Sequence, residues 1–217
     1  MVINMKKLSL VAMAFMAFLS VFSIIVQQRL ANLSSVTLII GIIVFFITSK
    51  SEKAEGNGDG LDIKKVPGLL KDKTVWRLIM MPMLMNIICY IAADLFVPEY
   101  MEHLKGRTDF LALDRLPVLM LELVIAALGE EIAWRAFFQK QLSKICPFVP
   151  ALIISSLLFA VCHFTYGDMA VVLYDILFVF INAVFYGLIF QKTDNAYIST
   201  LAHLLANILG IVGVMII

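Results

Sequence analysis

The segment from Met169 to Phe190 reads MAVVLYDILFVFINAVFYGLIF and contains one charged residue, Asp175. Apolar runs of this kind cross a bilayer as a helix, because about 20 residues rising 1.5 Å each cover the hydrocarbon core. Comparable runs lie on both sides of it, and the sequence predicts seven spans: 8–26, 33–48, 78–97, 117–139, 150–166, 169–190 and 196–216. We therefore expect an all-α, polytopic transmembrane helical bundle.

The composition agrees with a membrane protein. The chain has 217 residues, of which 62% are hydrophobic and only 15% charged, and its mean hydropathy is +0.97. These values are too apolar for an ordinary soluble domain. The net charge of +1 and the absence of a basic run give no sign of a nucleic-acid partner. The lipid bilayer is the first partner that the sequence predicts.

The distribution of basic residues predicts the orientation, because short cytoplasmic loops collect Lys and Arg. Twelve fall on the side of the N-terminus and four on the other side. The twelve are Lys6, Lys7, Lys50, Lys53, Lys64, Lys65, Lys71, Lys73, Arg77, Lys140, Lys144 and Lys192, and the four are Arg29, Lys105, Arg107 and Arg115. The bias favours a cytoplasmic N-terminus and an uncleaved first span in a multi-pass protein.

One stretch interrupts the apolar pattern. Residues 49–77 carry mixed charges and the run Gly56-Asn57-Gly58-Asp59-Gly60, which is typical of a flexible linker. We expect it on the cytoplasmic side, inside a single membrane-embedded domain that covers 1–217. The polar motifs described next all fall within 117–210, which we expect to form the catalytic core.

Three short motifs lie in three different predicted spans: Glu130-Glu131-x-x-x-Arg135, Phe159-x-x-x-His163 and His203-x-x-x-Asn207. Charged and polar side chains within spans face a bundle interior or a water-filled cavity rather than lipid. At 1.5 Å per residue, Glu130, His163 and His203 lie about 15, 20 and 17 Å from the cytoplasmic ends of their spans. Similar depths allow the three motifs to form one polar site.

The spacing within the first motif separates its two carboxylates. Glu131 and Arg135 share one helix face and can neutralise each other. Glu130 is turned by about 100° around the helix from Glu131, so it cannot pair with Arg135 in the same way. Its negative charge is therefore less compensated than that of Glu131. A carboxylate in that position can take a proton from water during hydrolysis, which makes Glu130 the candidate general base. Taken alone, Glu131 with Arg135 could equally be a structural ion pair.

The other two motifs add an imidazole each. Phe159 lies one turn before His163, where its ring can wedge beside the imidazole and exclude water and lipid. His203 and Asn207 are also one turn apart and project together, so they can offer two donors to one polarised oxygen. His103 lies in a predicted loop, where we expect it to be solvated.

In these motifs and their order, the chain resembles the CPBP family, also called the CAAX protease or Abi family, of intramembrane endopeptidases. The matching patterns are E-E-x-x-x-R, F-x-x-x-H and H-x-x-x-N/D. The chain has Ala136 where Gly often follows the Arg, and Trp134 where Phe is frequent. These two differences concern helix packing and the shape of the pocket. We expect Trp134, together with Phe159 of the second motif, to influence substrate binding.

The resemblance implies cleavage of a peptide or protein substrate by a water held by Glu130 and His163. His203 and Asn207 would stabilise the oxyanion, and Glu131 and Arg135 would organise the site. No metal is favoured, but zinc is an alternative with Glu130, His163 and His203 as its ligands. The family includes bacterial members linked to bacteriocin maturation, self-immunity and peptide-signal processing, so a bacterial cell membrane is the expected location.

Two other classes of function stay open. A transporter could use midplane charges to carry protons or ions, although no internal repeat is visible to support it. A non-catalytic immunity or scaffold protein could keep the fold to bind a partner.

Overall fold

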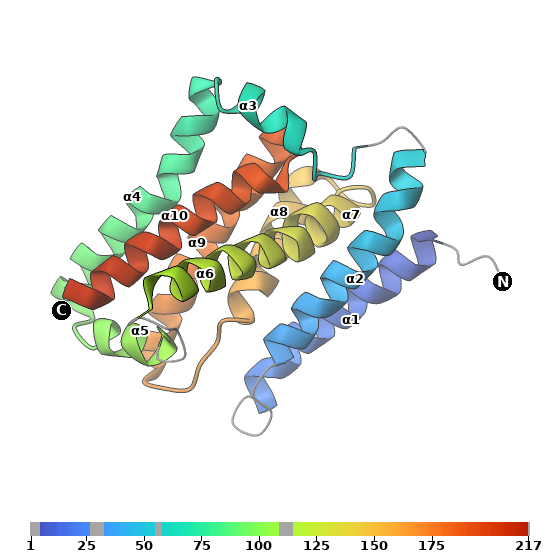
Figure 1. Cartoon of the computed structure of the whole chain (residues 1–217). Helices are drawn as coiled ribbons and strands as arrows, with labels where there is room; N and C mark the ends of the chain where they lie inside the picture. Colours follow the sequence, from blue (N-terminus) through green and yellow to red (C-terminus); the bar gives the residue numbers. More distant parts are fainter. Residues whose placement is uncertain (1–4, 27–32, 55–57, 109–114, 217) are drawn as a thin grey trace.

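Nearly all of the described chain is helical. The computed structural model describes residues 5–26, 33–54, 58–108 and 115–216, and no strand occurs among them (Figure 1). The helices are α1 (Met5–Val26), α2 (Leu33–Ala54), η1 (Ile63–Lys65), α3 (Val66–Leu69), α4 (Lys73–Phe96), α5 (Tyr100–Thr108), α6 (Leu116–Glu131), η2 (Ile132–Gln139), α7 (Lys140–Leu142), α8 (Phe148–Val161), α9 (Met169–Thr193) and α10 (Ala196–Ile216). The predicted all-α bundle is confirmed.

Five helices of the described chain are long and apolar enough to cross a membrane, namely α1, α2, α4, α9 and α10. They correspond to five of the seven predicted spans. The predicted span 117–139 begins as α6 and continues without a break through η2, whose turns are π-helical, into α7. It is therefore one long helix with a changed pitch in its second half.

The predicted span 150–166 is wrong at its C-terminal end. Helix α8 has 14 residues and stops at Val161, so it is about 21 Å long, against a hydrocarbon core of about 30 Å. It ends because the next amides turn back on the helix: His163 N–H donates to Ala160 O and Phe164 N–H to Val161 O. His163 consequently lies on a tight turn after the helix and not within it.

The predicted linker 49–77 also differs from expectation. Residues 49–54 extend α2 and residues 73–77 begin α4. The described stretch between them is held to the bundle, since the carbonyl of Gly60 accepts from Ala196 N–H at 2.7 Å and that of Asp62 from the Asn195 side chain at 2.7 Å. Gly60 has a φ of 85°, a conformation that other residues rarely adopt.

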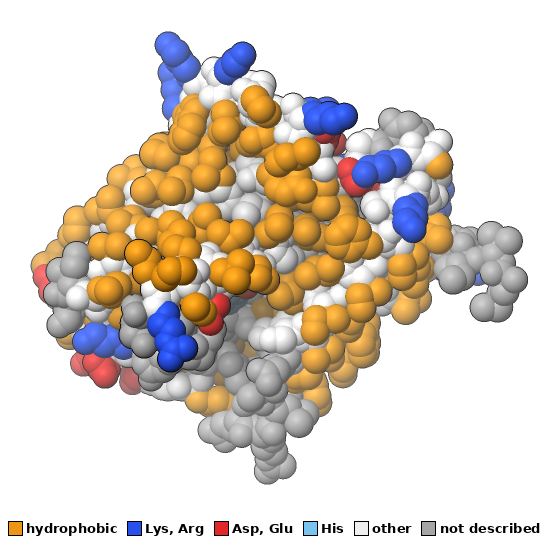
Figure 2. All heavy atoms as spheres, in the orientation of Figure 1, with side chains coloured by type: hydrophobic (Ala, Val, Ile, Leu, Met, Phe, Trp, Pro, Cys, Tyr) orange, Lys and Arg blue, Asp and Glu red, His pale blue; other side chains and the backbone are white. Residues whose placement is uncertain are grey.

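Most basic residues gather at one end of the bundle, where α3 and α7 lie (Figures 1 and 2). Ion pairs join the helix ends there: Lys144 with Glu52 at 2.6 Å, Lys140 with Asp194 at 2.7 Å and Lys192 with Asp72 at 3.8 Å. We call this the lysine end and define it by Lys50, Lys53, Lys64, Lys65, Lys71, Lys73, Arg77, Lys140, Lys144 and Lys192. Arg29, one of the four basic residues predicted on the other side, lies outside the described residues.

The centre of the bundle is η2, all of whose residues are buried. Small residues let neighbouring helices approach it closely. A Cβ on Gly41 of α2 would lie 2.7 Å from Cβ of Ala133. In α9, the carbonyl of Gly187 accepts a hydrogen bond from the Gln139 side chain at 3.0 Å. These contacts fix the position of η2, and with it the end of α6 that carries the two glutamates.

The Gly187→Ala substitution is expected to lower the free energy of unfolding by about 1–3 kcal/mol, the usual cost of overpacking. The added Cβ would overlap Cδ1 of Leu152 and Oε1 of Gln139. Unfolding in mixed detergent micelles measures the change. The control is Gly68→Ala in α3, where a Cβ would meet nothing within 4 Å. Equal stability of the two variants would contradict this account of the helix packing.

Candidate active site

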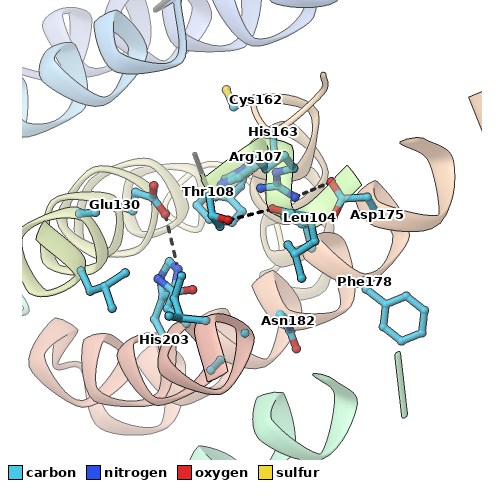
Figure 3. A pocket seen from close by; sticks show the side chains of 18 of the residues that line it. Leu104, Arg107, Thr108, Glu130, Cys162, His163, Asp175, Phe178, Asn182 and His203 are labelled. Carbon is cyan, nitrogen blue, oxygen red and sulfur yellow. Dashed lines mark hydrogen bonds and ion pairs between the residues drawn. The ribbon is translucent and has the colours of Figure 1, made fainter. Parts of the chain in front are cut away.

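A cavity of ≈ 680 Å³ lies between α2, α4, α5, α6, α9 and α10 (Figure 3). Six of the residues predicted from the three motifs line it: Glu130, Trp134, Phe159, His163, His203 and Asn207. The remaining two, Glu131 and Arg135, are almost completely buried beside it. The structure therefore brings side chains of all three motifs to the walls of one cavity.

The imidazole of His203 lies between the two glutamates of the first motif. Its Nδ1 is 3.0 Å from Oε1 of Glu131, and its Nε2 is 3.6 Å from Oε2 of Glu130. Figure 3 shows the second contact, which crosses from α6 to α10. Because an ionised carboxylate only accepts hydrogen bonds, the Nδ1 of His203 carries its proton toward Glu131. The opposite nitrogen is then directed at Glu130, the glutamate that faces the cavity.

Arg135 compensates the buried carboxylate of Glu131. Its Nε is 3.5 Å from Oε2 of Glu131, and its Nη2 donates to the carbonyl of Ala183 at 3.1 Å. The guanidinium also lies over the ring of Phe159, at 4.5 Å from the ring centroid, and 5.5 Å from that of Tyr186. A buried ion pair with such contacts holds its helices in one arrangement.

His163 is oriented by the turn that ends α8. Its Nδ1 lies 2.9 Å from the carbonyl of Phe159. Since a carbonyl can only accept, Nδ1 is the protonated nitrogen and Nε2 of the neutral ring keeps a lone pair. The ring of Phe159 lies 4.6 Å from the imidazole, centroid to centroid, as the motif spacing predicted.

Aromatic side chains pack around both histidines. Tyr186 stacks on His203 with centroids 4.4 Å apart and an interplanar angle of 15°. Trp134 packs edge-on against Phe159 at 6.0 Å, and both rings border the cavity. The spacing of the motifs gave no signal for Tyr186, because in the sequence it is one of many aromatic residues in an apolar helix.

A second charged cluster lines the cavity, and sequence reasoning missed it. Asp175 of α9 is buried and forms an ion pair with Arg107, which also lines the cavity (Figure 3). A second ion pair joins Asp175 to His103 at 3.5 Å. The expectation that His103 is solvated in a loop was wrong: it lies in α5 and is largely buried. Asp175 is about 70 residues from its partners in the sequence, so no local spacing could reveal the cluster.

The zinc alternative concerns three side chains that line the cavity, Glu130, His163 and His203. In the part of the chain that the structure describes, no three His, Cys, Asp or Glu residues are close enough together to hold a metal ion. Of the proposed ligand set, Glu130 and His203 are in contact, and His163 donates from Nδ1 to the carbonyl of Phe159, which leaves its Nε2 free. We derive no catalytic step through a metal.

Comparison with known protein families agrees with the geometry. Residues 112–209 match the family model described as type II CAAX prenyl endopeptidase Rce1-like. This segment, 98 of the 217 residues, matches the CAAX protease family. The matched segment contains the three motifs together with α6, η2, α8 and α9 and most of α10. The chain is accordingly a CAAX-type membrane protease. No curated protein and no solved structure gives a match to the chain.

Proposed function

We propose that the protein is an intramembrane endopeptidase that hydrolyses a peptide or protein substrate with a water activated by Glu130 and His163. The observation that carries the proposal is the position of His203 between Glu131 and Glu130 at the wall of the cavity. In the proposal, this arrangement supplies a base and hydrogen-bond donors at the wall of one cavity. Such a set is what amide hydrolysis needs.

In the proposed reaction, Glu130 takes a proton from the water as the oxygen attacks the carbonyl carbon of the substrate. His163 orients the same water, because its free Nε2 accepts a hydrogen bond while Phe159 holds Nδ1. Glu130 then passes the proton to the leaving amine as the C–N bond breaks. His203 stands against Glu130 and keeps that carboxylate in place.

The negative charge on the carbonyl oxygen needs donors in the tetrahedral intermediate. His203 and Asn207 lie one turn apart on α10 and both border the cavity, so they supply that role in the proposal. In this role His203 is doubly protonated, so that its Nδ1–H donates to Glu131 and its Nε2–H to the oxyanion, while Arg135 balances the charge of Glu131. One well-placed donor is worth about 3 kcal/mol in the transition state.

Removal of metal ions tests the choice between activated water and zinc. We expect the cleavage rate of purified protein to be unchanged after incubation with a strong zinc chelator and gel filtration, because Glu130 and His163 supply the base. Elemental analysis of the same sample measures the metal content. Loss of activity in the chelated sample, with recovery on adding zinc alone, would contradict the proposal.

The substrate and the cellular setting belong to the same proposal. The resemblance to the family supports a role in peptide maturation or self-immunity in a bacterial cell membrane. The excess of basic residues at the lysine end supports a cytoplasmic N-terminus. A prenylated substrate, which the description of the matched family names, is a further candidate class.

The test is cleavage by the purified protein in lipid nanodiscs. Candidate substrates, farnesylated and unmodified peptides and bacteriocin precursors among them, are incubated with it, and new termini are read by mass spectrometry. Internal cleavage of one class supports the proposal and names the substrate. A protein that confers immunity or moves ions while cleaving no peptide would instead support a scaffold or a transporter.

A further inference from the structure

The part of the cavity wall that α4 and α10 form carries a polar side chain that the proposed reaction does not use. The two helices pack side by side (Figure 1). Tyr90 of α4 and Gly210 of α10 both line the cavity. A Cβ on Gly210 would lie 3.3 Å from Oη of Tyr90, and one on Gly213 would lie 3.1 Å from Cε2 of its ring. The two glycines therefore leave the space on α10 in which the ring of Tyr90 lies.

The hydroxyl of Tyr90 is free to bind a ligand. Within the described residues it forms no hydrogen bond to another side chain or to the backbone, whereas the hydroxyl of Tyr174 on α9 donates to the carbonyl of Cys89. Its oxygen is also not sealed in the core, unlike the unpartnered Oδ1 of Asn182. A tyrosine hydroxyl that is largely surrounded by protein usually finds a partner. Since this hydroxyl adjoins Gly210, it is open to a molecule that enters the cavity.

Asn86 fixes the position of Tyr90 along α10. It lies one turn before Tyr90, and its Nδ2 donates to the carbonyl of Ala206 at 2.9 Å. Because that carbonyl can only accept, the amide of Asn86 has one orientation, and its Oδ1 accepts from Nδ2 of Asn182 at 2.7 Å. The side chain of Asn86 thus joins α4 to α9 and to α10, at the residue that precedes Asn207.

Tyr90 consequently lies close to the residues that bind the oxyanion in the proposed reaction. Gly210, which its hydroxyl adjoins, is three residues after Asn207, so the two lie on one face of α10 about 4.5 Å apart along the axis. An extended peptide advances about 3.3 Å per residue. A substrate that runs along α10 with its cleaved carbonyl at His203 and Asn207 therefore brings a residue one or two positions away to this hydroxyl.

The chemistry of this wall suits the main chain of a peptide. Apart from the catalytic His203, the described lining residues of α4 and α10 are uncharged, namely Asn86, Tyr90, Ala206, Asn207, Gly210 and Ile211. The charged lining residues Arg107, Glu122, Glu130 and Asp175 belong to α5, α6 and α9. A neutral hydroxyl donor at a fixed position matches a neutral acceptor, and the peptide carbonyl is the acceptor that every residue of a substrate carries.

From this arrangement we propose that the hydroxyl of Tyr90 donates a hydrogen bond to a main-chain carbonyl of the substrate, one or two residues from the cleaved bond. Tyr90 is then a substrate-binding residue that helps to select which peptide bond lies against Glu130. The inference rests on the proposed function, because it needs a peptide that the protein cleaves. The contact lies outside the bond that breaks, so it contributes to binding and not to proton transfer.

Tyr90→Phe removes the hydroxyl and keeps the ring that packs against Gly213. With one defined peptide and protein in lipid nanodiscs, we expect KM to rise about three- to tenfold, the usual effect of losing one neutral hydrogen bond. The value of kcat should not change, which is the sign of lost binding that is equal in the ground state and the transition state. Thermal unfolding shows that the variant is folded.

Tyr174→Phe is the matched control for this variant. It removes the same group from a tyrosine whose hydroxyl is bound to the backbone and which is not among the described lining residues of the cavity. We expect KM and kcat of this control to equal those of the wild type.

A second measurement locates the carbonyl that Tyr90 binds. The carbonyl oxygens of the peptide on both sides of the cleaved bond are replaced by sulfur one at a time, because a thioamide accepts hydrogen bonds more weakly. At the contacted residue, KM of the wild type should rise several-fold and that of Tyr90→Phe should not. Such non-additivity is what a double-mutant cycle gives for a direct contact.

Two results would overturn the inference while peptide cleavage itself is observed. The first is a KM of Tyr90→Phe equal to that of the wild type, or a loss that falls on kcat alone. The second is a thioamide series in which KM of the wild type and of Tyr90→Phe rises equally at every position. A wild type that cleaves no peptide contradicts the proposed function itself and removes this inference with it, so the two failures are told apart.

Discussion

Replacing Glu130 by glutamine is expected to lower kcat for peptide cleavage by about 10³-fold, within the range usual for the loss of a general base. Glutamine has nearly the same shape but cannot accept the proton of the attacking water. Glu130 borders the cavity and is only 3.6 Å from Nε2 of His203. The effect should therefore fall on kcat, with little change in KM, and steady-state kinetics with one defined peptide measures both.

The control for this variant is Glu102→Gln, the same chemical change on the exposed surface of α5. It should cleave at the wild-type rate. Thermal unfolding of both variants should match that of the wild type, which shows that the loss is chemical. Cleavage by Glu130→Gln at more than a tenth of the wild-type rate would rule out Glu130 as the base.

Replacing Glu131 by leucine is expected to destabilise the protein by about 4 kcal/mol, because it leaves a buried charge without its partner. Glu131 is 0% exposed, and its carboxylate contacts both Arg135 and His203. The guanidinium of Arg135 would keep its contacts with Ala183 and the aromatic rings but lose its counter-ion. Unfolding in mixed detergent micelles measures the change in free energy.

A double variant separates structure from catalysis at this site. Glu131→Leu combined with Arg135→Met removes both charges, and replacing a buried ion pair by apolar residues is often close to neutral for stability. We expect most of the lost stability to return while activity stays low, since His203 lacks the acceptor for its Nδ1. A double variant as unstable as the single one would show that the ion pair is not the source of the effect.

The sequence predicted the parts of this protein that depend on local pattern. Long apolar runs indicate spanning helices because length and hydropathy are read directly from the residues. The side chains of the three motifs were expected to form one site because motif spacing fixes the helix face and rise per residue fixes the depth. Glu130, His163, His203 and Asn207 do line one cavity.

The features that sequence reasoning missed depend on contacts between distant segments. The end of α8 at Val161 follows from tight turns that an apolar run does not reveal. The burial of His103 depends on Asp175, which lies on another helix. The placement of His203 between two glutamates was also not foreseen, because the face that α10 turns toward α6 is set by packing.

The central claim is that these side chains split a peptide bond with water, and oxygen labelling tests it most directly. Purified protein is incubated in ¹⁸O-enriched water with a peptide that it cleaves, and the products are examined by mass spectrometry. The account predicts ¹⁸O in the new carboxyl group, formed by the wild type and not by Glu130→Gln. A purified protein that forms no cleavage product from any substrate class, or a Glu130→Gln variant that forms it at the wild-type rate, would contradict the account.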